Sequence, residues 1–169
     1  MTKLLVLEKQ FVRVAAFDVS FTALERTKDK LKIDRMSETV QNKLELFQSS
    51  LTYRDKRFEG FDCACVVEVI EHLDKSSLSA FARILFEFSR PRTVILTTPN
   101  VEYNVNYEGM KENSLRHEDH RFEWNREQFA KWADGICEKY GYRIKIKQIG
   151  GDGGETGTPT QMGVFTLCE

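Results

Sequence analysis

Long hydrophobic runs are missing from this sequence of 169 residues. No apolar stretch approaches the roughly 20 residues that a membrane-spanning helix needs, and the first residues lack the pattern of a secretory signal peptide. These absences argue against a membrane protein. A strong net charge is missing too, because the formal net charge is only −1. Any contact with a nucleic acid would therefore depend on a local basic patch rather than on the field of the whole molecule.

Cysteine is scarce, and its spacing does not match the common thiolate motifs. The four cysteines are Cys63, Cys65, Cys137 and Cys168, and none of them forms a Cys-x-x-Cys pair. Cys63 and Cys65 are two residues apart in an apolar run, so on a strand they would share one face and could not easily form a disulfide. We expect reduced thiols in the core of a cytoplasmic protein, with a metal or disulfide role as the alternative.

Patterns typical of strands and helices alternate along the chain. Residues 61–67 (FDCACVV) form a near-continuous apolar run, which is typical of a strand buried on both faces. Ser20 is a suitable N-cap for a helix over residues 21–33. The other expected strands cover residues 11–17, 43–47, 93–97, 142–148 and 163–167, and the other expected helices cover residues 76–89 and 125–140. This alternation predicts one α/β domain over residues 1–169 with a mostly parallel sheet.

Apolar spacing assigns the inward faces of the two later helices. In the helix over residues 76–89, the side chains expected to face the core are Leu78, Phe81, Leu85 and Phe88. In the helix over residues 125–140 they are Phe129, Trp132, Ala133 and Ile136. Each helix should therefore pack one side against the sheet.

Polar residues follow several of the expected strands. In open α/β sheets ligands bind beyond the carboxyl ends of the strands, here residues 18–20, 48–51, 68–72 and 98–104. Asp18, at the end of the first strand, could accept hydrogen bonds from a ribose diol. Ser49 and Ser50, after the next strand, could contact the edge of an adenine ring. Each of these signals is weak when taken alone.

Two carboxylates and an imidazole follow the apolar run at residues 61–67. Glu68, Glu71 and His72 stand at positions i, i+3 and i+4, which share one face of a helical turn. Crowding two anions at one point is costly unless a cation neutralises them. Mixed carboxylate and imidazole ligands suit Mg²⁺ or Mn²⁺ better than a metal that prefers thiolates. The alternative is a solvated turn with an incidental histidine.

Histidine is also rare, and its distribution strengthens the metal interpretation. Of three histidines, His72 lies in the turn just described, while His117 and His120 lie in the segment 115–124 (LRHEDHRFEW). His120 could complete a metal shell with the ligands of the 68–72 turn, and His117 or Asp119 could orient a ligand. A run of charged residues is otherwise most often a solvated surface.

These two segments resemble the Hua-enhancer family of small-RNA 2′-O-methyltransferases, and its bacterial RNA-repair branch in particular. The resemblance includes residues 97–100 (TTPN) and 103–104 (YN), and it runs from about residue 4 to residue 167. It implies the Rossmann-like fold of S-adenosylmethionine-dependent methyltransferases. It also implies an RNA 3′ end with free 2′- and 3′-hydroxyls as substrate, and a kinase or ligase of RNA end repair as a partner.

The resemblance also implies roles for individual residues. Those implied to bind a divalent metal, Mg²⁺ or Mn²⁺, and to form the catalytic centre are Glu68, Glu71, His72 and His120. Those implied to hold S-adenosylmethionine are Asp18, Ser49 and Ser50. In the family the metal contacts both hydroxyls of the terminal ribose, which explains the selection of 3′ ends. The metal would lower the pKa of the 2′-hydroxyl, and His72 or a neighbouring imidazole could accept its proton.

Basic and aromatic residues in and near the segment 115–124 are candidates for RNA contacts. The candidates for contacts with phosphate are Arg116, His117, Arg121 and Arg126. Surface solubility is the alternative explanation for them. Phe122 and Trp124 could stack on a base, although we favour packing in the core.

Glycine is absent from the first part of the chain, where the family has a glycine-rich loop. Family members begin with a strand and a Gly-x-Gly loop that holds the methionine end of the cofactor, whereas the first glycine here is Gly60. By alignment the chain begins in the helix after that loop and lacks a strand from the centre of the sheet. We therefore expect residues 3–8 (KLLVLE) to form a helix rather than a substitute strand, and S-adenosylmethionine to bind weakly.

Two other functions stay open at this point. A protein with the metal site but without the methyl donor would bind RNA 3′ ends without modifying them. A metal-dependent hydrolase would use the same carboxylates and imidazoles to activate water. That function would leave Asp18 and Ser50 without a purpose.

Overall fold

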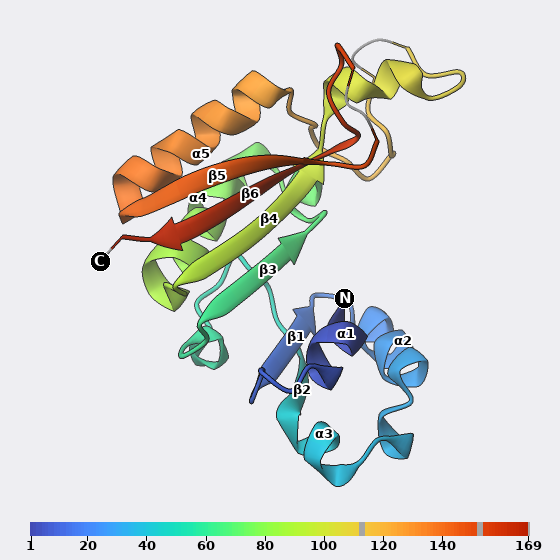
Figure 1. Cartoon of the computed structure of the whole chain (residues 1–169), viewed down its shortest axis with the longest axis vertical. Helices are drawn as coiled ribbons and strands as arrows, with labels where there is room; N and C mark the ends of the chain where they lie inside the picture. Colours follow the sequence, from blue (N-terminus) through green and yellow to red (C-terminus); the bar gives the residue numbers. More distant parts are fainter. Residues whose placement is uncertain (112–113, 152–153, 169) are drawn as a thin grey trace. The chain divides into compact units, whose positions relative to one another are not determined.

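The computed structural model describes residues 1–111, 114–151 and 154–168. Over these residues the chain divides into two compact units, Met1–Tyr53 and Arg54–Glu169 (Figure 1). The first unit has a two-stranded sheet and the second a four-stranded sheet. Among the residues described, none of the helices combines the length and the apolar character that a membrane span requires.

The first unit is a small parallel sheet with short helices. Its main elements are α1 (Thr2–Leu7), β1 (Val14–Asp18), α2 (Phe21–Leu31), α3 (Glu38–Lys43) and β2 (Leu44–Gln48). The helix expected over residues 3–8 is present as α1, and its Val6 is buried. The Lys43 Nζ donates a hydrogen bond to the Val6 carbonyl oxygen at 2.8 Å, which joins α3 to α1.

Helix α2 begins as the sequence predicts. The Ser20 Oγ accepts a hydrogen bond from the Ala23 backbone N–H at 3.2 Å, so Ser20 is the N-cap. The buried side chains of α2 are Leu24 and Leu31. Strands β1 and β2, on either side of α2, run parallel, and parallel neighbours need a crossover connection such as this one.

The four-stranded sheet of the second unit is mixed. Its strands, in the order β3-β4-β6-β5, are β3 (Cys63–Val67), β4 (Thr93–Pro99), β6 (Thr160–Leu167) and β5 (Tyr142–Ile149). Strands β3 and β4 are parallel, and β6 runs antiparallel to both of its neighbours. The expected α/β class is therefore present, with the parallel pairs early in the chain and an antiparallel hairpin at its end. The Gly-rich connection of this hairpin lies partly outside the described residues, at positions 152–153.

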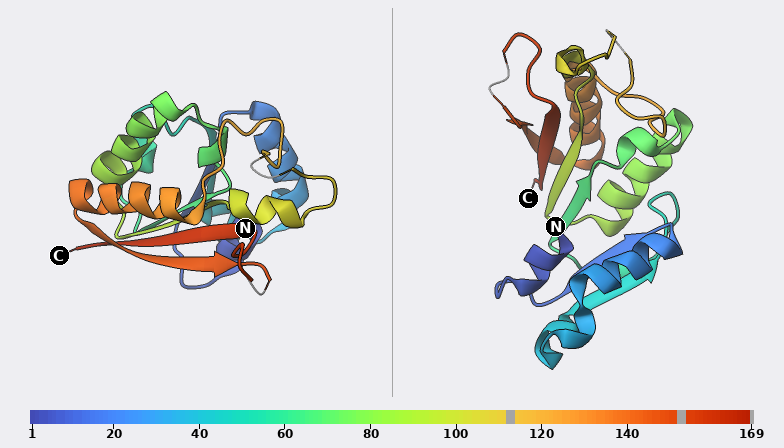
Figure 2. Two further views of the ribbon diagram at one scale, coloured as in Figure 1. Left: turned by 90° about the horizontal axis from the view of Figure 1, so that it is seen from above. Right: turned by 90° about the vertical axis from the view of Figure 1, so that its right-hand side faces the viewer.

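The core of the second unit lies between its helices and one face of its sheet. The helices are α4 (Leu78–Ala82), which continues into the π-helix η5 (Arg83–Ser89), and α5 (Arg126–Tyr140). Figure 2 shows both helical segments on the same side of the sheet. Four phenylalanines from these elements and from β6 are fully buried: Phe81, Phe86, Phe129 and Phe165. Helix α5 starts with a capping box between Asn125 and Gln128.

The helix expected over residues 76–89 differs from a regular α-helix. After Ala82 its backbone widens into the π-helix η5, in which hydrogen bonds span five residues instead of four. Phe86, four residues after the buried Ala82, is 0% exposed and contacts the Phe165 ring at a centroid distance of 5.0 Å. Phe88, which the α-helical spacing predicted to face inward, is only half-buried.

The expectation that residues 61–67 form a strand buried on both faces is wrong. Among the described residues β3 pairs only with β4, so it is an edge strand of its sheet. Val66 is buried, but Val67 is 41% exposed. The four cysteines are free, but the expectation that they lie in the core is wrong, because Cys63 and Cys168 are exposed and Cys65 and Cys137 are only half-buried.

Candidate functional site

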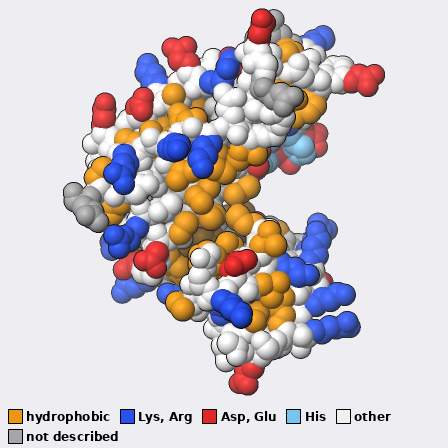
Figure 3. Space-filling view, in the orientation of Figure 1, with side chains coloured by type: hydrophobic (Ala, Val, Ile, Leu, Met, Phe, Trp, Pro, Cys, Tyr) orange, Lys and Arg blue, Asp and Glu red, His pale blue; other side chains and the backbone are white. Residues whose placement is uncertain are grey.

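The two histidine-containing segments meet in the second unit. Glu71, His72 and His120 each offer a ligand atom, and these atoms lie within 4.8 Å of one another. The rings of His72 and His120 are nearly perpendicular, with centroids 4.8 Å apart. Figure 3 shows histidine side chains beside acidic ones at the surface of this unit. One carboxylate and two imidazoles therefore converge at the carboxyl end of β3.

A strained turn after β3 places two of these side chains. Glu68 has a φ of 53°, in the left-handed region that non-glycine residues seldom adopt, and the chain turns sharply there. Its backbone N–H donates to the Thr97 carbonyl oxygen and to the Thr97 Oγ1, both at 3.2 Å. A 3₁₀ turn, Ile70–His72, follows, and the fully buried Ile70 anchors it. The turn is thus fixed to β4 on one side and to the core on the other.

The Glu71 carboxylate is fully buried and only partly satisfied. Its Oε2 accepts a hydrogen bond from the Thr98 Oγ1 at 3.1 Å, while its Oε1 has no hydrogen-bond partner. Burial raises the pKa of Glu71 to about 7, and the nearby charges of Glu68 and Glu123 contribute to the rise. A buried carboxyl with a bare oxygen is stabilised either by a proton or by a cation.

Glu68 lies outside the group of three converging ligands. Its Oε1 is nevertheless buried and has no hydrogen-bond partner, as at Glu71. Its charge is close enough to contribute to the raised pKa of Glu71. The structure therefore brings together three of the four residues expected to bind a metal and places the fourth carboxylate beside them.

Glu123 is a site residue to which the sequence pattern assigned no role. Its fully buried carboxylate contacts the His120 Nδ1 at 2.5 Å. It also accepts hydrogen bonds from the Asn104 Nδ2 at 2.5 Å and the Arg116 backbone N–H at 2.6 Å. The sequence did contain a signal, because His120 and Glu123 stand at positions i and i+3, a spacing that allows two side chains to contact each other within one turn.

The candidates for RNA contacts fall into two groups. The guanidinium of Arg116 donates to the Asn104 Oδ1 at 3.2 Å and to the Pro159 carbonyl oxygen at 2.7 Å, so it is engaged inside the protein. The guanidinium of Arg126 forms an ion pair with Glu102 at 2.8 Å. The side chains of His117 and Arg121 are 55% and 62% exposed. This pair makes contacts at the surface only, His117 with Asp119 at 3.6 Å and Arg121 with Asp74 at 3.8 Å, so it can reach phosphate without breaking a contact in the interior.

The aromatic residues of this segment pack against one another. Phe122 is 5% exposed, and its ring lies 4.7 Å from the Trp124 ring between centroids. The Trp124 ring in turn lies 5.3 Å from the Trp132 ring of α5. The buried Phe122 belongs to the core, as we favoured, and is not free to stack on a base.

The residues expected to hold S-adenosylmethionine lie in the first unit. Asp18 ends β1, and its Oδ1 accepts a hydrogen bond from the Ser20 backbone N–H at 2.7 Å. The Ser49 backbone N–H donates to the Asp18 carbonyl oxygen at 3.1 Å. The Ser50 Oγ lies 2.9 Å from the Thr52 Oγ1. Asp18, Ser49 and Ser50 thus share one edge of a parallel sheet, where nucleotides bind in α/β folds.

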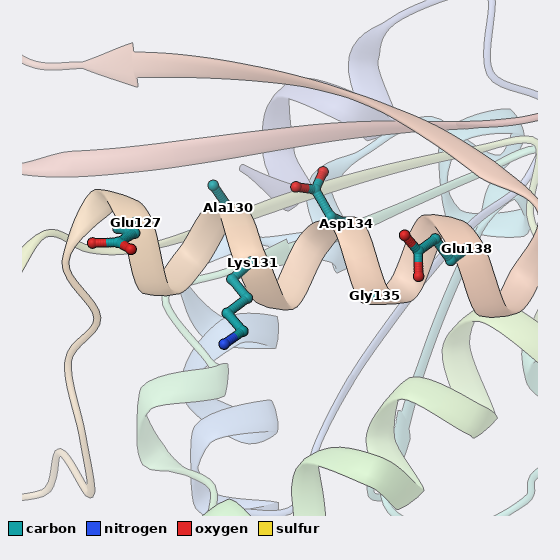
Figure 4. A pocket seen from close by; sticks show the side chains of 6 residues that line it. All are labelled: Glu127, Ala130, Lys131, Asp134, Gly135 and Glu138. Carbon is teal, nitrogen blue, oxygen red and sulfur yellow. The ribbon is translucent and has the colours of Figure 1, made fainter.

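An open pocket lies along the outer face of α5 (Figure 4). Its lining residues are Glu127, Ala130, Lys131, Asp134, Gly135 and Glu138. None of them was expected at the functional site. We assign no function to this pocket, because it lacks the converging polar groups that orient a ligand.

Comparison with known proteins identifies the family. A family model described as a methyltransferase domain matches residues 2–144. The crystal structure of the methyltransferase domain of bacterial CtHen1-C superimposes with a TM-score of 0.89 at 55% identity, covering 99% of this chain and 83% of that one. The chain belongs to the Hen1 family of methyltransferases. The Rossmann-like methyltransferase fold predicted from the sequence is thereby confirmed.

More distant Hen1 relatives extend the match to eukaryotes. The small RNA 2′-O-methyltransferase of Xenopus tropicalis is 39% identical over 126 residues, which are 73% of this chain and 34% of that protein. The crystal structure of small RNA methyltransferase HEN1 superimposes with a TM-score of 0.87 at 27% identity, covering 98% of this chain and 21% of that one. The chain spans about a third of the length of the curated relatives that it matches.

Proposed function

We propose that this chain acts in metal-dependent RNA methylation, transferring a methyl group from S-adenosylmethionine to the 2′-hydroxyl of the 3′-terminal nucleotide of small RNAs or RNA fragments. The observation that carries the proposal is the convergence of Glu71, His72 and His120 in a member of the Hen1 family. The proposed function accounts for both sets of polar residues, those of the carboxylate and imidazole cluster and those at the ends of β1 and β2.

The cluster fits a hard divalent cation. Two buried carboxylate oxygens without hydrogen-bond partners, on Glu68 and Glu71, accompany the imidazoles of His72 and His120. Oxygen and imidazole ligands together suit Mg²⁺ or Mn²⁺, and a cation would balance the crowded negative charge. When bound, such an ion lowers the pKa of a hydroxyl that it contacts.

The residues of this chain have separate tasks in the proposed reaction. A neutral imidazole has one free nitrogen lone pair, so it cannot ligate the cation and accept a proton at the same time. In the proposed reaction Glu68, Glu71 and His120 would hold the cation, and His72, the exposed imidazole of the cluster, would accept the proton of the ribose 2′-hydroxyl. The freed oxygen attacks the methyl carbon, the sulfur–carbon bond breaks, and its electron pair stays on sulfur to give S-adenosylhomocysteine. Asp18 would accept hydrogen bonds from the cofactor ribose, with Ser49 and Ser50 near the adenine. His117 and Arg121 would contact the RNA backbone.

Methyl transfer to RNAs that differ only at the 3′ end tests this proposal. We expect label from S-adenosylmethionine, supplied at saturating concentration with Mn²⁺, on an RNA that ends in a 2′,3′-diol. The same RNA ending in a 2′-deoxy, 3′-deoxy or 3′-phosphate nucleotide should remain unlabelled, and so should the diol RNA in the presence of a chelator. Label on internal nucleotides, or transfer that survives chelation, would contradict the proposal.

A second candidate function is binding of RNA 3′ ends without methyl transfer. It is favoured by the division of the chain, because Glu71, His72 and His120 lie in the second unit and the residues expected to hold the cofactor lie in the first. Fluorescence anisotropy with the same set of RNAs would separate the two. Metal-dependent binding that prefers the diol end, without any methyl transfer at saturating cofactor, would favour the second candidate.

The expected partner and location follow from the same family resemblance. We expect a cytoplasmic protein that works with a kinase or ligase of RNA end repair. Purification of the tagged chain should therefore recover RNA kinase or RNA ligase activity, and recovery of neither would argue against this association.

A further inference from the structure

His120 is held by a chain of hydrogen bonds that runs through the protein interior. The side chain of His120 is 8% exposed and that of Glu123 is 0% exposed. The Glu123 Oε1 contacts the His120 Nδ1 at 2.5 Å and the Arg116 backbone N–H at 2.6 Å, and its Oε2 contacts the Asn104 Nδ2 at 2.5 Å. Three nitrogens therefore surround one buried carboxylate.

Arg116, at the end of this series of hydrogen bonds farthest from His120, fixes the direction of each bond in the series. The Arg116 guanidinium can only donate, and it donates to the Asn104 Oδ1 at 3.2 and 3.3 Å. This contact orients the Asn104 amide, so its NH₂ group points to Glu123 and to the Ser114 carbonyl oxygen at 2.9 Å. The Arg116 backbone N–H is also an obligatory donor. Both oxygens of Glu123 thus accept from fixed donors, an arrangement that favours the ionised carboxylate.

The hydrogen between His120 and Glu123 then belongs to the imidazole. Glu123 already accepts from two fixed donors, the Asn104 NH₂ group and the Arg116 backbone N–H, and as an ionised carboxylate it accepts from His120 as well, so the His120 Nδ1 carries the hydrogen. In a neutral imidazole the other nitrogen, Nε2, is then bare and can act as a ligand. This is the nitrogen that His120 can offer beside Glu71 and His72, since its Nδ1 is engaged.

We propose that Glu123 is a positioning residue that sets His120 as the Nδ1-protonated tautomer before any cation arrives. The inference rests on the proposed function only in assuming that His120 is a metal ligand. Metal-binding histidines commonly donate their second ring nitrogen to a carboxylate, and loss of that partner weakens metal binding by roughly 10- to 100-fold. Asn104 and Arg116 belong to the same arrangement, because they orient the acceptor.

The histidine tautomers of the metal-free protein test this inference directly. Long-range ¹H–¹⁵N spectra of imidazole-labelled protein at about pH 8.5 distinguish the two neutral forms, and the pH lies well above the ordinary pKa of histidine. With three histidines in the chain, His72→Gln and His117→Gln variants leave the His120 signal assigned. We expect the Nδ1-protonated pattern at His120. An Nε2-protonated or doubly protonated His120 would overturn the proposal.

Glu123→Gln is the matching perturbation. In either orientation the NH₂ group of a glutamine would face another donor, the Asn104 NH₂ group or the Arg116 backbone N–H. A glutamine therefore cannot accept from Asn104, Arg116 and His120 together. We expect a mixture of His120 tautomers and a loss of Mn²⁺ affinity of roughly 10- to 100-fold by calorimetric titration. The control is Glu118→Gln, which removes an exposed acid from the same segment and should change neither. An unchanged tautomer together with an unchanged affinity in Glu123→Gln would contradict the proposal.

Neither measurement uses RNA or S-adenosylmethionine. A failure of methyl transfer would therefore leave this inference standing, and a wrong tautomer would leave the proposed function standing. If Glu123→Gln does not fold, the spectrum of the unmodified protein still decides the question.

Discussion

Replacing Glu71 with glutamine should stabilise the metal-free protein at alkaline pH, although it removes a proposed metal ligand. Burial raises the pKa of this carboxyl from the ordinary 4.5 to about 7. The folded protein therefore holds the proton more tightly than the unfolded chain does. Its stability declines as the pH rises from about 4.5 to about 7, and the full penalty is present above that range. A neutral glutamine of the same shape avoids this penalty.

The size of the effect follows from the same numbers. The difference between 4.5 and about 7 corresponds to an upper limit of roughly 3 kcal/mol. Water that reaches the bare Oε1 would reduce it, so we expect Glu71→Gln to gain about 1–3 kcal/mol at about pH 8 and little at about pH 5. With saturating Mn²⁺ the unmodified protein should be the more stable of the two, because an ion that binds only the folded state stabilises the protein that keeps its ligand Glu71.

Tryptophan fluorescence during urea unfolding measures the change in the unfolding free energy of the second unit, which contains Glu71. Both tryptophans, Trp124 and Trp132, lie in the second unit with Glu71, so their signal reports the unfolding of that unit. The titrations are run with a chelator at both pH values and with Glu118→Gln as the control for a lost surface charge. A Glu71→Gln protein that is equally or less stable than the unmodified protein at about pH 8 would refute the reasoning.

The remaining predictions concern the helix cap, the RNA surface and the cofactor. Asn125→Ala should lower the unfolding free energy by about 1 kcal/mol, because it removes the capping box of α5; urea unfolding measures it. Arg121→Ala should weaken RNA binding equally for all sequences and reduce the salt dependence of binding in fluorescence anisotropy. Arg116→Ala should instead lower the thermal midpoint, because the Arg116 guanidinium donates to Asn104 and to the Pro159 carbonyl oxygen. These 169 residues should bind S-adenosylmethionine only weakly in a calorimetric titration, because their first glycine is Gly60 and a glycine-rich loop normally holds the methionine end of this cofactor. Micromolar binding would contradict this last expectation.

The sequence by itself determined the features that depend on neighbouring residues. Ser20 and the start of α2 are an example, because an N-cap contacts backbone groups only two or three residues away. The spacing of Glu71 and His72 likewise placed both on one turn after a strand, and the alternation of apolar patterns gave the α/β class. His120 could be paired with that turn only because histidine is so rare here and because the segment resembles a known family.

Only the tertiary structure decided the features that depend on distant partners. Three features follow from contacts between segments far apart in the chain: the packing of Phe86 against Phe165, the exposure of Cys63 on an edge strand, and the engagement of Arg116 with Pro159. Glu123 is the clearest case. An acid in a charged segment is predicted to lie at the surface, whereas in the structure this one is buried against Asn104 and His120. Such contacts have no local signature, because burial and hydrogen-bond partners are set by the packing of the whole unit.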